Sequence, residues 1–265
     1  MDWNSNRDLV KQEFDRQGYL FIPQFLDTDE VEEIRREIAR YLHDVVPQIP
    51  STDVYFEVKG QLETIKQLIR MCQYDSYFET LIHSDRFVKL AELLLGSTVI
   101  GKNMQWFNKP AGVSRATPPH QDGYYFMLEP NEAVTMWLAL DEVTEENGCV
   151  RYLSGSHVRG MRAHERTDTL GFSQGIPDYG VEDKKNEVAI PARPGDLLVH
   201  HCLMIHRAEA NMSDRKRRAL GLIYYSSNAK EDVERARDYK RALELEIANQ
   251  GGSETHANLV TKLAG

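Results

Sequence analysis

The spacing of hydrophobic and polar positions divides the chain into a helical first part and a strand-rich second part. Apolar residues at helical intervals predict helices over residues 9–17 and 27–43, with a short strand over 19–23 between them. A further helical region is expected over about residues 61–95. Together these elements form a predicted segment of N-terminal helices over about residues 5–95.

The apolar periodicity changes from helical to strand-like after about residue 97. β-Branched and aromatic residues concentrate in short runs between turns, which predicts strands over residues 99–109, 134–143, 149–153, 196–201 and 218–226. Helices followed by many antiparallel strands predict a mainly β fold with flanking helices, a jelly-roll barrel with the helices packed on one side. The jelly-roll core is expected over about residues 97–227.

The chain shows no sequence repeat, no low-complexity tract and no linker rich in Pro, Gly and Ser, so residues 1–265 are expected to form a single domain. A long charged helix is predicted after the core, over about residues 231–248. This helix could cover a face of the sheet or carry a dimer contact. The protein is therefore expected to be a monomer or a homodimer.

Composition narrows the class of protein. Apolar residues make up 41% of the chain and charged residues 28%, which is typical of a soluble globular protein, and the net charge of -9 argues against nucleic acid or an anionic membrane as partner. Neither a membrane-spanning apolar run nor a secretory signal is visible. The three cysteines, Cys72, Cys149 and Cys202, form no zinc or redox pattern. These features predict a cytoplasmic location.

A candidate metal group is formed by His120-Gln121-Asp122 and a lone histidine, His206, far downstream. Residues i and i+2 of a strand point to the same side, so a strand would aim His120 and Asp122 at one point. Two histidines and one carboxylate with open positions are the ligand set of non-haem Fe(II) oxygenases. A His-x-Asp triplet alone arises often by chance, and a lone histidine after an apolar run is more often a core residue. Their combination predicts a metal site.

Arg217 follows His206 by eleven residues and begins the next predicted strand. We expect an antiparallel neighbour to bring Arg217 beside His206, with the adjacent Arg218 facing the opposite way. A guanidinium at the base of a metal pocket offers a planar fork for a carboxylate. A dicarboxylic 2-oxo acid has the matching groups, because one end can chelate the metal while the other meets the arginine.

Several short motifs resemble the phytanoyl-CoA dioxygenase family in order and spacing. They are His120-Gln121-Asp122, Asn147-Gly148-Cys149, Ser154-Gly155-Ser156-His157, Gly195-Asp196 and His206 with Asn211, Ser213 and Arg217. The opening Gly18-Tyr19-Leu20-Phe21-Ile22-Pro23 is also similar, so the resemblance covers about residues 9–226. It implies a double-stranded β-helix related to cupins, with Fe(II), 2-oxoglutarate as co-substrate, O2, and ascorbate as a candidate reductant.

The resemblance also assigns roles to single residues. It implies that His120, Asp122 and His206 are the iron ligands and that Arg217 binds the remote carboxylate of 2-oxoglutarate. Family members often carry a hydroxyl residue two places after the distal histidine, where this chain has Ala208. A hydrogen bond to the co-substrate is then lost.

Three further residues match positions that contact 2-oxoglutarate in the family: Trp137, Asn103 and Thr117. Trp137 is equally well explained as core packing.

The implied activity is hydroxylation of an unactivated C–H bond, with release of succinate and CO2 from 2-oxoglutarate. Asp122 argues against halogenation, because the related halogenases have a small residue at that position. We expect a small soluble metabolite as substrate. Residues 124–127, Tyr-Tyr-Phe-Met, either form an apolar wall near the iron or pack in the core, and the basic irregular stretch 159–186 either meets an anionic group or is a solvated loop.

Two alternatives from other classes stay open. One is a non-catalytic barrel that binds a metal or small ligand as a sensor, against which the joint presence of the three metal ligands and Arg217 argues. The other is a cupin-like metal enzyme that does not use 2-oxoglutarate. Arg217 discriminates here, because such an enzyme has no general need for a guanidinium at that position.

Overall fold

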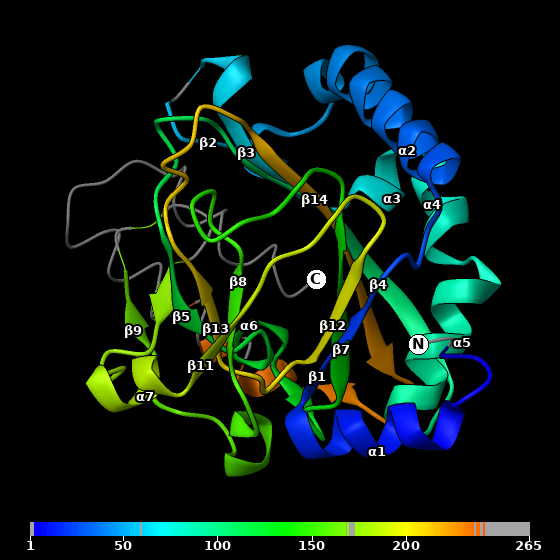
Figure 1. Cartoon of the computed structure of the whole chain (residues 1–265), viewed down its shortest axis with the longest axis vertical. Helices are drawn as coiled ribbons and strands as arrows, with labels where there is room; N and C mark the ends of the chain where they lie inside the picture. The colour runs from blue at the N-terminus through cyan, green and yellow to red at the C-terminus, as the bar shows by residue number, and fades with distance from the viewer. Residues whose placement is uncertain are drawn as a thin grey trace.

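Two antiparallel sheets form the centre of the molecule, and helices cover the outer face of the larger one (Figure 1). The computed structural model describes residues 3–58, 60–167, 169, 173–235, 237–238 and 241. In sheet order, the seven-stranded sheet contains β1 (Tyr19–Ile22), β12 (Leu197–His201), β7 (Ala133–Ala139), β14 (Arg217–Ser226), β4 (Val99–Lys109), β3 (Ile65–Leu68) and β2 (Val54–Phe56). The four-stranded sheet contains β11 (Glu187–Ile190), β8 (Val150–Leu153), β13 (His206–Ala208) and β5 (Thr117–His120).

The other elements are short pairs of strands and a set of helices. The strand pairs are β9 (Glu165–Arg166) with β10 (Gln174–Gly175) and β6 (Leu128–Glu129) with β15 (Lys230–Glu231). The α-helices are α1 (Arg7–Gln17), α2 (Thr28–Arg40), α3 (Met71–Tyr74), α4 (Ser76–Ile82), α5 (Asp85–Leu95), α6 (Gly123–Phe126) and α7 (Val181–Lys185). A π-helical turn η1 (Tyr41–Val45) and the 3-10 turns η2 (Val46–Gln48), η3 (Ser51–Asp53), η4 (Leu62–Thr64) and η5 (Ser156–Arg159) complete them.

Strand β14 shows how the sequence separates the two faces of the large sheet. Successive side chains of a strand point to opposite faces. Leu220, Leu222 and Tyr224 pack in the core beneath the helices, whereas Ala219 belongs to the cluster between the sheets. The face between the sheets is therefore the one that can carry a site, and the helix-covered face supplies stability.

Helix α2 illustrates how the covering helices form. Asp27 accepts a hydrogen bond from the Glu30 amide, and the Glu30 side chain accepts one from the Asp27 amide, which makes a capping box at the helix start. Val31, Ile34 and Ile38 recur at helical spacing and are buried in the core. Each such side chain contributes roughly 1.5–3 kcal/mol by leaving water. The helix is thus fixed at its start and along one face.

The structure confirms the mainly β prediction with flanking helices and a jelly-roll core, and it corrects two boundaries. Residues 61–70 are not helical, because η4 is followed there by strand β3, which pairs with β4. All four residues of β3 are buried, so the alternation that marks a strand is missing from the sequence. The sheets also begin before residue 97, because β1, β2 and β3 all join the large sheet.

Two further predictions concern the C-terminal helix and the long irregular stretch. Most of the helix expected over residues 231–248 lies outside the described residues. The stretch 159–186, expected to be irregular, includes β9, β10 and α7 among its described residues. Within the described ranges, the structure has no helix that combines the length and the apolar character needed to cross a membrane.

Candidate active site

The two histidines of the candidate metal group lie on paired strands of the small sheet. His120 ends β5, His206 begins β13, and the two residues are direct partners in the antiparallel register. Their ring centroids are 4.2 Å apart. Asp122 lies beyond the end of β5, in helical backbone conformation at the start of α6. The strand predicted to carry both His120 and Asp122 is therefore shorter than expected, and the turn into α6 brings the carboxylate to the histidines.

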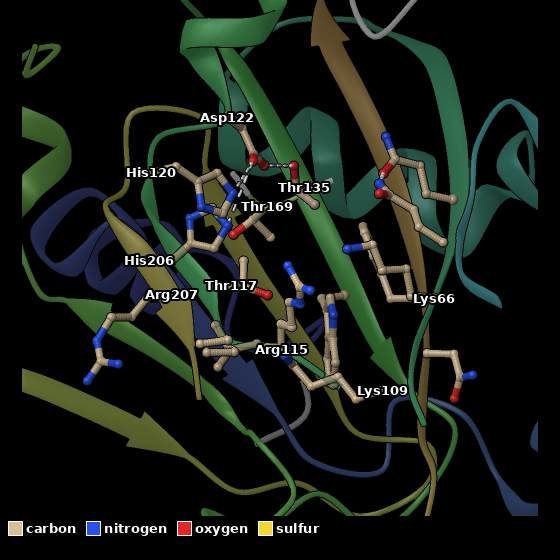
Figure 2. Close-up of a pocket in the computed structure, with 18 of the residues that line it drawn as sticks. Lys66, Lys109, Arg115, Thr117, His120, Asp122, Thr135, Thr169, His206 and Arg207 are labelled. Atoms are coloured by element: carbon tan, nitrogen blue, oxygen red, sulfur yellow. Dashed lines mark hydrogen bonds and ion pairs between the residues drawn. The ribbon is translucent and has the colours of Figure 1, made fainter. Parts of the chain in front are cut away.

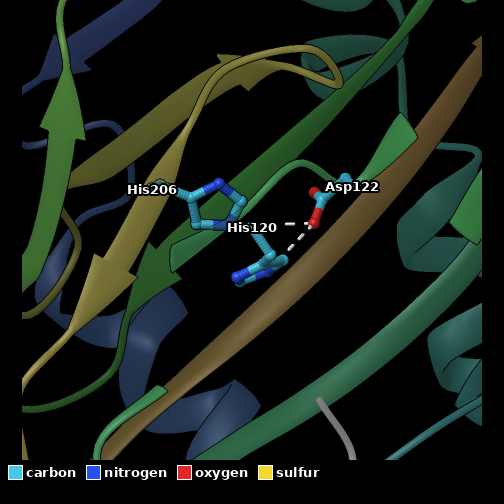
Figure 3. A group of neighbouring side chains, drawn as sticks. All are labelled: His120, Asp122 and His206. Atoms are coloured by element: carbon cyan, nitrogen blue, oxygen red, sulfur yellow. Dashed lines mark ion pairs between the residues drawn. The ribbon is translucent and has the colours of Figure 1, made fainter. Parts of the chain in front are cut away.

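The three side chains converge on one point (Figure 3). His120 Nε2 lies 3.5 Å from Asp122 Oδ1, and His206 Nε2 lies 3.7 Å from the same oxygen. One ligand atom from each residue lies within 4.8 Å of the others. These separations leave room for one metal ion bound to three protein atoms.

Backbone carbonyls fix which nitrogen of each histidine is available to a metal. His120 Nδ1 lies 2.8 Å from the Pro118 carbonyl oxygen, and His206 Nδ1 lies 3.0 Å from the Met204 carbonyl oxygen. A carbonyl oxygen only accepts hydrogen bonds, so each Nδ1 carries the proton and donates. The Nε2 atoms that face Asp122 are then the unprotonated ones, the form in which histidine binds metals.

A second set of contacts orients the Asp122 carboxylate. Thr135 Oγ1 donates a hydrogen bond of 2.6 Å to Asp122 Oδ2, and His200 Nε2 lies 3.1 Å from the same oxygen. Tyr152 Oη lies 2.9 Å from His200 Nδ1. The Tyr152 hydroxyl can therefore donate to Nδ1, and His200 then carries its proton on Nε2 and donates it to Asp122. With Oδ2 occupied by two donors, Oδ1 is the oxygen left for a metal ion.

The charge states at this site match a divalent cation. Burial raises the pKa of Asp122, but His206, His120 and His200 lower it by more, so the pKa lies well below its usual value and the carboxylate is ionised. Burial, His120 and His200 hold the pKa of His206 well below its usual value, so this imidazole is neutral. An ionised carboxylate beside neutral imidazole is the donor set that a divalent metal requires.

A cavity of about 120 Å³ extends from the metal group between the two sheets. One water needs roughly 10–15 Å³ of such space, so the cavity has room for a small molecule. Figure 2 shows the residues around it, with Asp122 at one end and Lys109 at the other. Its lining includes Glu57, Lys66, Gln67, Gln105, Phe107, Asn108, Lys109, Arg115, Thr117, Tyr125, Phe126, Thr135, Trp137, Thr169, His200, Arg207, Ala208, Arg217 and Ile223.

Arg217 reaches this cavity from the large sheet, opposite the strand that carries His206. The expectation that the two residues lie on neighbouring strands is wrong, because β13 pairs with β5 and β8, whereas β14 pairs with β4 and β7. Their facing sides nevertheless meet in the cavity. Arg218 points the other way and donates two hydrogen bonds to the Asp141 carboxylate.

The Arg217 guanidinium is the clearest sign of an anionic ligand. The side chain is 4% exposed, its Nε has no hydrogen-bond partner, and no carboxylate among the described residues forms an ion pair with it. Its Cζ lies 5.1 Å from the centroid of the Trp137 ring. Burial lowers the pKa of Arg217 to about 10, so the group is charged at neutral pH. A buried charge without a counter-ion is costly, and a bound carboxylate would supply one.

The structure brings most of the predicted co-substrate residues to the cavity. Trp137 and Thr117 line it, and Thr117 is the register partner of Ala208, where family members often have a hydroxyl. Asn103 is not among the described lining residues, because its Oδ1 accepts a hydrogen bond from the Arg70 amide. Gln105, two residues further along β4, lines the cavity in its place.

Sequence reasoning also missed Thr135, His200 and Tyr152. The structure places His200 buried beside Asp122, on strand β12. This strand pairs with β7, which carries Thr135. The available signal was alternation: His200 follows Leu198 by two residues and so faces the cavity side of the sheet.

Only some of the residues expected to face the substrate line the cavity. Of residues 124–127, Tyr125 and Phe126 line the cavity. In the stretch 159–186, Arg162 forms ion pairs with Asp178 and Asp183. The structure therefore supports the apolar wall for two of the four residues and gives Arg162 an internal counter-charge.

The jelly roll, its His-Asp-His group and the buried arginine define a non-haem iron oxygenase that depends on 2-oxoglutarate. The chain belongs to the phytanoyl-CoA dioxygenase family, because residues 14–219 match the family described as "Phytanoyl-CoA dioxygenase (PhyH)". This membership confirms the resemblance seen in the sequence.

Curated relatives agree with that assignment. A phytanoyl-CoA dioxygenase of Arabidopsis thaliana is 29% identical over 244 residues, covering 79% of this chain and 85% of the relative. The peroxisomal phytanoyl-CoA dioxygenase of Rattus norvegicus is 25% identical over 230 residues, covering 82% and 68%.

Solved structures with the same fold differ in their reactions. EvdO2 from Micromonospora carbonacea, solved with 2-oxoglutarate, has a TM-score of 0.66 at 26% identity, covering 84% of this chain and 91% of the other. The carbocyclase SnoK of nogalamycin biosynthesis has a TM-score of 0.67 at 26% identity, covering 84% and 85%. The epimerase SnoN in complex with Fe3+ and alpha ketoglutarate has a TM-score of 0.69 at 23% identity, covering 86% of each chain.

Proposed function

We propose that this protein hydroxylates an unactivated C–H bond of a small soluble metabolite. The substrate, O2 and 2-oxoglutarate would give the alcohol, succinate and CO2. The observation that carries the proposal is the continuous cavity that runs from the three metal-binding side chains to the counter-ion-free Arg217. A 2-oxo dicarboxylate has one group for each end of that cavity.

The donor set fits iron. His120 and His206 present unprotonated Nε2 atoms and Asp122 presents one free oxygen, which leaves three positions of an octahedron open. Fe(II) bound there, with 2-oxoglutarate and O2, supplies the oxidising power for cleavage of the C–H bond.

In this scheme the protein residues orient a metal ligand and hold the co-substrate. Thr135 and His200 hold the Asp122 carboxylate so that one oxygen faces the metal. Arg217, packed over Trp137, binds the remote carboxylate of 2-oxoglutarate through its planar fork.

Tyr125 and Phe126 supply apolar surface beside the metal group, where the substrate carbon would lie and water would be displaced. Ascorbate is proposed as the reductant that restores iron after uncoupled turnover. A cytoplasmic location and a monomeric or homodimeric state stay predictions from the sequence.

An anaerobic titration tests the proposal. Adding Fe(II) and then 2-oxoglutarate to the purified protein is expected to produce a visible metal-to-ligand charge-transfer band that needs both components. Asp122→Ala is expected to lose the band and all substrate oxidation while keeping the far-ultraviolet circular dichroism of the parent. A folded parent protein without the band would exclude the oxygenase and favour a metal-binding or sensor role.

Candidate metabolites can then be screened by their effect on the band. The product of a hit separates hydroxylation from other outcomes. Gain of one oxygen atom supports the proposal, whereas an isomer or a product that has lost two hydrogen atoms would contradict it. SnoN and SnoK, an epimerase and a carbocyclase, show that proteins of this fold include both kinds of alternative.

A further inference from the structure

Two buried cations lie side by side at the end of the cavity remote from the metal group. Lys109, the last residue of β4, is the register partner of Arg217, the first residue of β14. Directly opposed residues of an antiparallel pair project from the same face with their Cβ atoms about 4.5–5.5 Å apart. Both side chains line the cavity, and Lys109 is 6% exposed.

Among the described residues of the cavity, Lys109 shares with Arg217 the lack of a counter-charge, and the other basic residues differ from them. Lys66 lies 3.8 Å from the Glu57 carboxylate, and Arg207 forms ion pairs with two glutamates, Glu187 and Glu209. Arg115 is exposed to solvent. No carboxylate of the described residues lies within ion-pair distance of Lys109. Lys109 and Arg217 are thus the two buried cations of this cavity that still need an anion.

The Lys109 ammonium also has hydrogen-bonding capacity to spare. Its Nζ donates one hydrogen bond of 2.7 Å, to the Arg115 carbonyl oxygen. An ammonium group has three N–H donors, so this bond uses one of them. The remaining donors belong to a group that is buried against the cavity, where a ligand is the available acceptor.

Electrostatics make this pair unfavourable without a ligand. Burial, then Arg217 and Lys66, lower the pKa of Lys109 to about 7, and the carboxylates of Glu57 and Glu209 offset only part of this lowering. Two like charges that are out of water and next to each other cost free energy unless an anion lies between them. The arrangement is therefore that of a site built for a carboxylate.

We propose that Lys109 is a second anchor for the remote carboxylate of 2-oxoglutarate, which it shares with Arg217. The inference rests on the proposed function, since it names a further residue that recognises the same co-substrate. A carboxylate has two oxygens with about four acceptor positions, enough for the fork of Arg217 and one donor from Lys109. Lys109 would also compensate for Ala208, a lining residue that offers no hydroxyl to the co-substrate.

Binding should then depend on pH in a defined direction. A bound carboxylate stabilises charged Lys109, so it raises the pKa of this group above the value of about 7 in the free protein. Above pH 7 the protein must take up a proton when 2-oxoglutarate binds. The affinity should therefore fall as pH rises through the interval between the free and the bound pKa, by up to tenfold for each pH unit.

The test compares two ligands on four proteins. Isothermal titration calorimetry under anaerobic conditions measures binding of 2-oxoglutarate and of 2-oxobutanoate to the Fe(II)-loaded parent, Lys109→Met, Lys109→Arg and Lys102→Met. 2-Oxobutanoate keeps the group that chelates iron and lacks the remote carboxylate. Lys102→Met is the matched control, because it removes the same charge from the same strand at a residue that lies over Tyr225, outside the described cavity lining.

Lys109→Met is expected to weaken 2-oxoglutarate binding about tenfold or more and to leave 2-oxobutanoate binding unchanged. It should also abolish the loss of affinity above pH 7, and Lys109→Arg should restore most of the binding. Equally weakened binding of both ligands would mean that Lys109 only holds the loop at Arg115. Unchanged 2-oxoglutarate binding would exclude a contact with Lys109. Either result overturns the inference. A parent protein that binds no 2-oxoglutarate overturns the proposed function and this inference together, whereas a normal parent with an unaffected variant removes the inference alone.

Discussion

His200 Nε2 lies 3.1 Å from Asp122 Oδ2, so a histidine outside the metal group holds the carboxylate inside it. The same oxygen accepts the hydrogen bond from Thr135. Contacts of this kind orient metal ligands, and their loss usually lowers metal affinity by about 10- to 100-fold. The geometry therefore predicts measurable effects for residues that do not touch the metal.

Thr135→Val should lower the affinity for Fe(II) by about 10-fold, because valine keeps the shape of the side chain and loses the hydroxyl donor. Competition against a chromophoric chelator under anaerobic conditions measures this affinity. Thr80→Val, at an exposed position on α4, is the matched control. An unchanged affinity in Thr135→Val would show that the hydrogen bond does not orient Asp122.

His200→Phe and Tyr152→Phe should both weaken metal binding, the first more strongly. Tyr152 acts through His200, since its hydroxyl contacts His200 Nδ1 and fixes the proton on Nε2. The two changes are therefore expected to be non-additive: Tyr152→Phe should have no further effect on metal affinity in a His200→Phe background. Independent, additive losses would contradict the hydrogen-bonded chain.

Arg217→Met should raise the dissociation constant of 2-oxoglutarate by about 100-fold and leave Fe(II) affinity unchanged, because a charge-assisted pair of hydrogen bonds is lost at one end of the ligand. Arg218→Met is the neighbouring control. Its guanidinium bonds Asp141 on the other face, so this change should lower stability without altering co-substrate affinity. Equal effects of the two variants on 2-oxoglutarate binding would contradict the assignment of Arg217.

Gly195→Ala should destabilise the fold by at least about 2 kcal/mol, measured by denaturant unfolding. Gly195 has φ of 90°, and an added Cβ would lie 2.3 Å from the Leu26 carbonyl oxygen. Gly96→Ala separates the two causes, because Gly96 also has positive φ (66°) and an added Cβ there meets nothing within 4 Å. That variant should cost only about 1 kcal/mol, from the backbone conformation alone. Equal losses would mean that the contact with Leu26 is relieved without cost.

Short-range patterns were enough to predict the metal group and the opposite orientations of Arg217 and Arg218. The alternation of side chains between the two faces of a strand is a local property, and β14 follows it: Arg218, Leu220 and Leu222 face one way, Arg217 and Ala219 the other. Strand β3 was missed because its polar residues Lys66 and Gln67 are as buried as its apolar ones, so the strand has no alternation to detect. The buried polar residues of this strand line the cavity, whose position cannot be seen in the sequence.

The supporting residues of the site could not be predicted, because they depend on register between distant strands. Thr135 and His200 are direct partners in the pairing of β7 with β12, and this pairing alone brings both to Asp122. The position of Asn103 could not be predicted for a related reason. Asn103 and Gln105 lie on the same face of β4, but the Asn103 side chain accepts a hydrogen bond from the amide of the distant Arg70, and Gln105 lines the cavity.

The two ends of the cavity belong to different sheets. His120 and His206 project from the small sheet, whereas Arg217 and Trp137 project from the large one. A 2-oxoglutarate molecule bound between them would bridge the two sheets, which otherwise meet through side-chain packing. Motions that separate the two sheets would then require release of 2-oxoglutarate. The amide hydrogens of β13 and β14 should therefore exchange with solvent more slowly, and at a common rate, when 2-oxoglutarate is bound.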